Sequence, residues 1–526
     1  MHIENLQMLI SQAEKWIDFD YLIDELRVVA SNIKNNQIVQ IIDDALIKSR
    51  ILNMNNATAK LLELRVKQEF HLTEKIDELS KYTDEMVKLA TEGDCKGNLA
   101  LSYTTKWGIE KLKGNKETSN EALTKAKEFT EKLKSKDYSY YICTYSFVIN
   151  DWFENHDLKN TDKLEECSDY FLKNGYFRSF AQTLTILAII FATMQNGNRI
   201  LDRCRQIFEN KNLFEELPLD VKGFSYYLTG LGYMMKMNLN FAESLFQKAY
   251  DILKPIHKNS IYFSNFIILH SHLITVKALQ GKIEQTWRIV KEVEELLAQE
   301  FFTKNLDLNT KNQIRHTLNL NKFYVCTRSK DFDSEEMQDL IEDLFVTSKT
   351  QYSNFMLLSE YILNSNLESD KLKELLATDN FNINRVKHII SYVLLSRTEQ
   401  NSTNKLFLER IEILVKREKT EITTFIENVL ADLLIAQQLF SLTRYGDIYS
   451  LLVKYKNQLN RIEVLEMRVF MEAFIQVGAY KTGDPLGPAL QYMAIKKCRQ
   501  YGFSRLENKL LEYLNIQGID TLRMLA

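Results

Sequence analysis

The chain has 526 residues, of which 16 are glycine and 4 are proline, whereas average usage gives about 37 and about 26 for this length. Strand-rich folds need many turn residues that tolerate positive φ, so this composition argues against all-β and βαβ architectures. The 67 basic and 70 acidic residues leave a net charge of −3, which carries no electrostatic footprint for nucleic acid or an anionic membrane.

The composition also bears on the compartment. The cysteines are scattered without a CxxC pair, which is typical of free thiols in a reducing environment; they are Cys95, Cys143, Cys167, Cys204, Cys326 and Cys498. The N-terminus has no basic and apolar regions of a signal peptide. The most apolar run, 180–194, is shorter than the roughly 20 residues that span a membrane and predicts a buried helix. We therefore expect a soluble, cytoplasmic protein.

From the N-terminus onward, the sequence is a succession of amphipathic segments separated by short polar breaks. The segment that begins at 74–82 carries Ile76, Leu79 and Met86 at spacings of three and seven, which place them on one helical face. Thr118 and Glu121 fit a capping box at the start of another helix. Glycines just after periodic runs predict left-handed C-terminal caps at Gly93, Gly114, Gly175, Gly197, Gly281 and Gly502.

This pattern predicts roughly 22 helices joined by short loops, which force neighbouring helices to be antiparallel. No linker rich in Gly, Ser or Pro divides the chain. Since a helical hairpin cannot bury its apolar face alone, successive hairpins must stack. We therefore predict an all-α fold, a right-handed superhelical α-solenoid of antiparallel helical hairpins.

One repeat points to a family. Residues 223–254 read GFSYYLTGLGYMMKMNLNFAESLFQKAYDILK and are followed by Pro255. This stretch resembles a tetratricopeptide repeat (TPR), a helical hairpin of 34 residues. The resemblance assigns large residues to the groove between hairpins and small ones to the helix crossing. The repeat-packing positions it implies are Tyr226, Gly230, Tyr233, Ala242, Phe246 and Ala249.

The motif weakens elsewhere. The next hairpin, 265–296, keeps Gly281 at its turn, but Thr286, Val290 and Val293 replace the small and aromatic residues. A third, weaker copy of the motif at 487–507 looks like the divergent repeats in the helical sensor domains of large bacterial transcription activators. Divergent repeats like those of proteasome-lid or cohesin-loader scaffolds are an alternative.

We expect one continuous array, 1–526, in four sections. Divergent N-terminal helices occupy 1–96 and TPR-like hairpins occupy 97–304. Divergent hairpins follow at 305–445, and TPR-like capping helices at 446–526.

The search for catalytic and cofactor motifs finds none. Gly281-Lys282 lacks the upstream glycine and following hydroxyl of a P-loop, and Gly230-Leu231-Gly232 lacks the third glycine of a dinucleotide fingerprint. On a helix, His270 and His272 point in opposite directions and cannot chelate one ion. The acids and histidine at 151–157 lack further ligands. We expect no catalytic, metal or cofactor-binding residue and no enzyme.

The resemblance allows one test of partner type. Repeats that bind acidic chaperone C-termini carry Lys, Asn or Arg at the fifth and ninth positions of the first helix. Here those positions hold Tyr227 and Leu231, then Ser271 and Thr275, so we expect no carboxylate clamp. Aromatic residues are densest at 138–141 and 226–227, and some of them are expected to line the concave groove. The candidate partner-binding groove consists of Phe224, Tyr227, Leu231 and Met234.

The leading hypothesis is a protein- or peptide-binding scaffold or adaptor that uses the concave face of the solenoid. The alternative is a regulatory sensor that responds to a peptide or small ligand. An enzyme hidden in a helical fold is a third, less favoured class.

Overall fold

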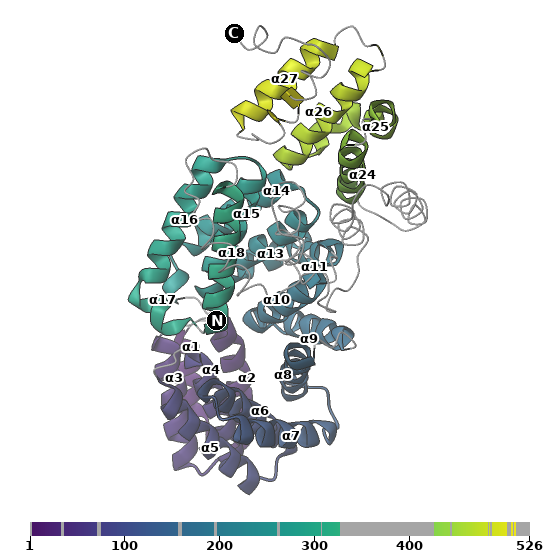
Figure 1. The fold of residues 1–526 in the computed structure, drawn as a ribbon. Helices are drawn as coiled ribbons and strands as arrows, with labels where there is room; N and C mark the ends of the chain where they lie inside the picture. The colour runs from purple at the N-terminus through teal and green to yellow at the C-terminus, as the bar shows by residue number, and fades with distance from the viewer. Residues whose placement is uncertain are drawn as a thin grey trace. The chain divides into compact units, whose positions relative to one another are not determined.

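The computed structural model describes residues 3–326 and 425–511, with gaps at 33–35, 71–74, 156–159, 194–196, 260–262, 307, 442–443, 482, 484–486, 502–506 and 509. Within these ranges every element is a helix and none is a strand, which confirms the all-α prediction for the described part of the chain (Figure 1). The chain forms two compact units. The first contains residues 1–232, 245–269 and 296–307; the second contains 233–244, 270–295 and those from 308 onward.

The helices follow one another at short intervals. The N-terminal helices are α1 (Ile3–Gln12), α2 (Trp16–Asn32), α3 (Asn36–Ile51), α4 (Asn55–Glu69), α5 (Ile76–Glu92), α6 (Lys96–Lys113), α7 (Lys116–Glu131), α8 (Tyr138–Asn155), α9 (Thr161–Lys173), α10 (Phe177–Thr193), α11 (Gly197–Glu209) and α12 (Lys211–Glu216). Next come α13 (Leu219–Met235), α14 (Leu239–Leu253), the 3-10 helix η2 (His257–Asn259), α15 (Phe263–Leu279), α16 (Ile283–Ala298), α17 (Glu300–Asn305) and α18 (Leu308–Cys326). The last are α24 (Phe425–Ser441), α25 (Tyr445–Leu452), the 3-10 helix η4 (Val453–Arg461), α26 (Leu465–Lys481) and α27 (Gly487–Gln500).

From α1 to α12 each helix packs on its neighbour in sequence, and several of them also pack on the next but one. Helices α3 to α7 form an unbroken series of adjacent pairs. Helices α2, α4, α6 and α8 also pack in succession, each on the one two places further along. Helices joined by connections of a few residues are expected to be antiparallel.

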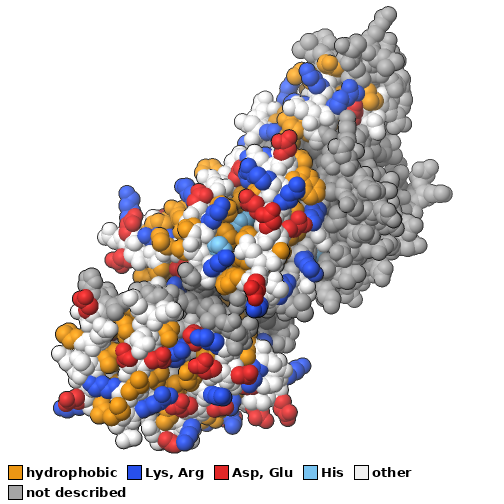
Figure 2. All heavy atoms as spheres, turned by 90° about the vertical axis from the view of Figure 1, so that its left-hand side faces the viewer, with side chains coloured by type: hydrophobic (Ala, Val, Ile, Leu, Met, Phe, Trp, Pro, Cys, Tyr) orange, Lys and Arg blue, Asp and Glu red, His pale blue; other side chains and the backbone are white. Residues whose placement is uncertain are grey.

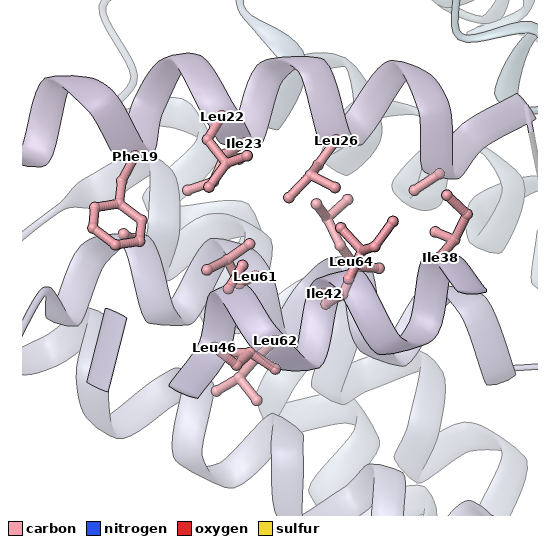
Figure 3. Packing of buried hydrophobic residues seen from close by; sticks show 14 of the residues in the cluster. Phe19, Leu22, Ile23, Leu26, Ile38, Ile42, Leu46, Leu61, Leu62 and Leu64 are labelled. Carbon is pink, nitrogen blue, oxygen red and sulfur yellow. The ribbon is translucent and has the colours of Figure 1, made fainter. Parts of the chain in front are cut away.

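The N-terminal core shows how the sequence directs this packing. Buried residues of α2 at positions 19, 22, 23 and 26 have the spacing of one helical face. They meet buried side chains of α3 and α4, as Figure 3 shows; the labelled residues are Phe19, Leu22, Ile23, Leu26, Ile38, Ile42, Leu46, Leu61, Leu62 and Leu64. A separate core of the second unit is formed by α24 to α27 around Leu433, Ile448 and Phe474.

The predicted helix ends are partly correct. Gly114, Gly175 and Gly281 have φ of +80°, +74° and +75°, as left-handed caps require. Gly93 ends α5 with a right-handed φ of −82°, and Gly197 begins a helix instead of ending one. The capping box at Thr118 is also wrong, because α7 already begins at Lys116. The cap predicted at Gly502 lies outside the described residues.

Three further predictions concern the apolar run, membrane spans and the division of the chain into sections. The apolar run at 180–194 falls mainly on α10, whose inward side chains such as Leu187 and Phe191 are fully buried, whereas Ile189 is 37% exposed. No helix of the described residues is long and apolar enough to cross a membrane. Most of the predicted section 305–445 lies outside those residues, so the section boundaries stay predictions.

In the clear repeat, a glycine sits at the closest approach of two helices. A Cβ atom on Gly230 of α13 would lie 2.6 Å from ring carbons of Phe246 on α14. Phe246, Ala242 and Ala249 are fully buried, so the phenyl ring has little room to move away. Gly232 faces the other way, toward Leu201 of α11, where a Cβ would lie 2.9 Å from the leucine side chain.

We predict that Gly230→Ala destabilises the protein by about 1–3 kcal/mol, because overpacking against Phe246 outweighs the gain in helix propensity. Urea unfolding followed by circular dichroism measures this change. The matched control is Gly446→Ala in α25, where a Cβ meets nothing within 4 Å and stability is expected to hold or rise. Equal effects of the two variants would contradict the packing argument.

Candidate functional site

The predicted groove residues lie in the interior. Phe224 is 1% exposed, Tyr227 5%, Leu231 8% and Met234 3%. The Tyr227 ring centroid lies 5.5 Å from that of Phe224 and 6.0 Å from that of Phe246. The prediction that these four side chains line an open groove is therefore corrected: they form part of the core.

The cause is that α13 has neighbours on two sides. Gly230 faces α14 and Gly232 faces α11, so little of the helix surface is left for solvent. Tyr226, predicted to fill the core, is half-buried, with its ring centroid 5.2 Å from that of Phe208 and 5.7 Å from that of Phe214. Tyr233 is half-buried as well. The two adjacent tyrosines, 226 and 227, thus have the opposite exposure to the one expected.

A different set of side chains converges in the N-terminal unit. Arg27 comes from α2, and Glu63 and Lys67 come from α4. Tyr138 begins α8, and Tyr176 lies in the turn before α10, a helix that packs on α2. We call these five residues the Arg27 cluster. Apart from Lys67, whose side chain is 34% exposed, each of them is at most 7% exposed.

The cluster is joined by short polar contacts. The Lys67 ammonium lies 2.5 Å from Glu63 Oε1 and donates to the Tyr138 hydroxyl at 2.7 Å. That hydroxyl in turn donates to Glu63 Oε1 at 3.4 Å. The guanidinium of Arg27 lies over the Tyr138 ring, 4.4 Å from its centroid. The Tyr176 ring meets the Tyr138 ring edge-on at 5.0 Å.

Several buried polar atoms here have no hydrogen-bond partner among the described residues. In the cluster they are Nε and Nη2 of Arg27 and Oε2 of Glu63; at its border they are Oδ1 of Asn32 and Oε1 of Gln68. Leaving a buried donor or acceptor unpaired is costly, and native proteins do it rarely. Unmet donors and acceptors in one place therefore indicate a site that is completed by another molecule, water or ligand.

The charged groups of the cluster shift one another's pKa values. Burial alone would lower the pKa of Lys67, but attraction to Glu63 and hydrogen bonds to Glu63 and Tyr138 outweigh it, so the pKa is raised. Burial and the nearby Glu63 carboxylate raise the pKa of the Tyr138 hydroxyl. Lys67 is therefore a fixed cation and Tyr138 a neutral phenol, which makes neither a nucleophile nor a base at neutral pH.

The sequence indicated one of the five residues of this cluster. The aromatic stretch 138–141 stands out by composition, and Tyr138 belongs to the cluster. Arg27, Glu63 and Lys67 carry no such signal, because single charges within amphipathic segments are indistinguishable from a solvated helix face. One hint is that α4 lacks a continuous polar face, since apolar residues surround Glu63 at positions 61, 62, 64 and 66.

The buried thiols and His272 also have shifted pKa values. Burial raises the pKa of Cys143 to about 11, and that of Cys167, Cys204 and Cys498 to about 12. Burial also lowers the pKa of His272 to about 4, so this imidazole is neutral at pH 7. Among the described residues no group of three or more His, Cys, Asp or Glu could hold a metal ion. His156 and Asp157 of the acidic stretch lie outside those residues.

Comparison with family models and with curated proteins finds no match for this chain.

The exposure of the adjacent tyrosines gives a direct prediction. Tyr227→Ala is expected to lower the free energy of unfolding by about 3–5 kcal/mol, the range for deleting a large buried aromatic side chain. Tyr226→Ala, at a half-buried position, is expected to cost about 1–2 kcal/mol. Urea titrations of both variants measure the difference, and a larger loss for Tyr226→Ala would sink this assignment.

The neutral imidazole of His272 gives a pH prediction. Unfolded histidine binds a proton below about pH 6.5, whereas folded His272 stays neutral until about pH 4. Its folded pKa is lowered, so this residue leaves stability unchanged above pH 6.5 and removes about 3 kcal/mol as the pH falls from 6.5 to 4.

Urea unfolding at pH 7 and pH 4.5 measures this loss. His272→Gln, which cannot be protonated, is expected to lose less stability between the two values than the wild type. The same loss in both proteins would show that His272 does not contribute.

Proposed function

We propose that this chain is a non-enzymatic, protein-binding scaffold or adaptor built as a TPR-like α-solenoid. The resemblance of residues 223–255 to a TPR is the starting point. Ion pairs at the TPR period support it: Arg199 with Glu165, Arg203 with Asp169, and Lys277 with Glu243 each join residues 34 positions apart. Contacts at one repeat length are expected where equivalent helices of successive hairpins lie side by side.

The exposed apolar side chains of α1 to α3 carry the proposal. On these three helices six large apolar side chains are between 50% and 73% exposed: Met8, Trp16, Ile17, Tyr21, Ile47 and Ile51. Figure 2 shows hydrophobic side chains among charged ones over the N-terminal helices, in the lower part of the view. Trp and Tyr are the residues that most often dominate the energy of a protein interface. The proposed contact surface therefore includes these exposed side chains of α1 to α3, in place of the buried positions of α13.

The protonation states of the buried groups support a non-enzymatic role. The pKa values of the described buried thiols are raised, so these groups are protonated and unreactive at neutral pH. Lys67 is likewise held as a cation, whereas a catalytic lysine has a lowered pKa.

The second candidate function is a ligand-responsive sensor. It is favoured by the unmet donors and acceptors of the Arg27 cluster, which a bound ligand would satisfy. This candidate needs no exposed apolar face, so the two functions are separable by experiment.

We predict that the wild-type chain, purified from its native cells at physiological salt, retains one or two stoichiometric protein partners. Trp16→Ser combined with Tyr21→Ser is expected to reduce partner recovery at least tenfold, as loss of two interface hot spots does. Melting temperature is expected to hold, because these side chains are 67% and 55% exposed.

The matched control is Leu112→Ser, which removes an exposed apolar side chain from α6. It is expected to leave partner recovery unchanged. A wild-type chain that purifies alone would contradict the scaffold proposal and favour the sensor.

A further inference from the structure

One face and one edge of the Arg27 guanidinium have identified partners. One face lies over the Tyr138 ring at 4.4 Å. One edge, Nη1, meets the carboxylate of Asp24 at 3.2 Å. The other edge carries Nε and Nη2, which are buried and have no hydrogen-bond partner in the part of the chain that the structure describes. These two neighbouring donors form the planar fork that binds a carboxylate through two parallel hydrogen bonds.

The charge of the enclosed groups sets the charge of a matching ligand. Arg27 and Glu63 are buried and Lys67 is 34% exposed, so the two cations and one carboxylate of the cluster leave one positive charge in excess. Asp24 balances it only from the surface, since its side chain is 70% exposed. A monoanion would neutralise the excess. A phosphate dianion would bring a second negative charge next to Glu63, where like charges repel.

The surroundings of the fork favour an apolar or aromatic body on the ligand. Tyr138 and Tyr176 lie next to Arg27, and Tyr170 continues the row of rings with its centroid 6.2 Å from that of Tyr176. Aromatic side chains with a few fixed polar groups are the usual lining of small-molecule sites. Because Arg27 is 6% exposed, a ligand that reaches the fork must be small or be the end of a longer molecule.

We propose that the Arg27 cluster is a binding site for a small monocarboxylic acid, held by the Nε–Nη2 fork of Arg27. This inference rests on the sensor candidate and is independent of the scaffold proposal. Lys67 adds the second positive charge, and the tyrosine rings contact the body of the acid. The ligand enters from the side of Asp24 and Lys67, the exposed members of this region, with displacement of the Asp24 side chain from Nη1.

The test is a thermal-shift and calorimetric titration of the full chain at constant ionic strength. The probes are acetate and benzoate, their neutral amides, benzylamine, and a short peptide with a free C-terminus. Both carboxylates are expected to raise the melting temperature, because binding to the folded state alone stabilises it. The amides lack the negative charge and are expected to give no shift.

Arg27→Lys keeps the charge but removes the fork, so it is expected to weaken carboxylate binding at least tenfold. The matched control is Arg203→Lys, because Arg203 is half-buried and its guanidinium is paired with Glu165 and Asp169 at 2.8 Å. That variant is expected to bind like the wild type. If Arg27→Lys does not fold, the contrast between acid and amide in the wild-type chain still decides.

Four results would overturn the inference. Equal shifts in melting temperature for the acids and the amides would show that the negative charge of the ligand does not contribute to binding. A shift with the peptide alone would replace the small acid by a chain terminus. A shift with benzylamine alone would leave the sensor function standing but exclude a carboxylate ligand, whereas no shift with any probe would count against both.

Discussion

A helix with neighbours all around it has no free face, and the rest of this structure follows from that constraint. Helix α4 is the clearest case, because α2, α3, α5 and α6 all pack on it. In α4 the six consecutive positions from Leu61 to Val66 are buried, which is more than a full helical turn. Everything that such a helix carries, charged residues included, becomes interior. The same constraint encloses α13 and removes the four side chains that its sequence offered as a groove.

Buried charges need partners of opposite charge, and the charged residues on and around α4 are only partly paired. Glu63 is fully buried and lies 2.5 Å from Lys67 of its own helix, while Arg27 arrives from α2. Since taking an ion out of water costs several kcal/mol even after relaxation, an ion pair of this kind is weak evidence for stability. Two other features say more about function: the excess positive charge of the cluster, and the Nε and Nη2 donors of Arg27 that lack hydrogen-bond acceptors in the described chain. Helix packing alone requires neither of them.

The sequence predicted the local structure well and the exposure of individual residues poorly. Helical periodicity and the scarcity of glycine and proline were enough for the all-α fold, and Gly114, Gly175 and Gly281 take the backbone conformation that their positions implied. Thr118 marks a start two residues inside α7, because capping patterns recur within helices and only packing decides which is used. Tyr226 and Tyr227 were assigned from a repeat motif, and the motif cannot state what covers a helix on its second side. Arg27 and Glu63 were not found at all, since a buried charge and a solvated charge look alike in one sequence.

Native-state hydrogen exchange tests the enclosure of these helices most directly, because slow exchange needs both hydrogen bonding and local stability. The account predicts that amides of α4 and α13 exchange among the slowest of the chain. Amides of α12, a helix of six residues none of which is buried, are predicted to exchange fast. If amides of α13 exchanged as fast as those of α12, α13 would not be enclosed, and its side chains would again be candidates for an accessible groove.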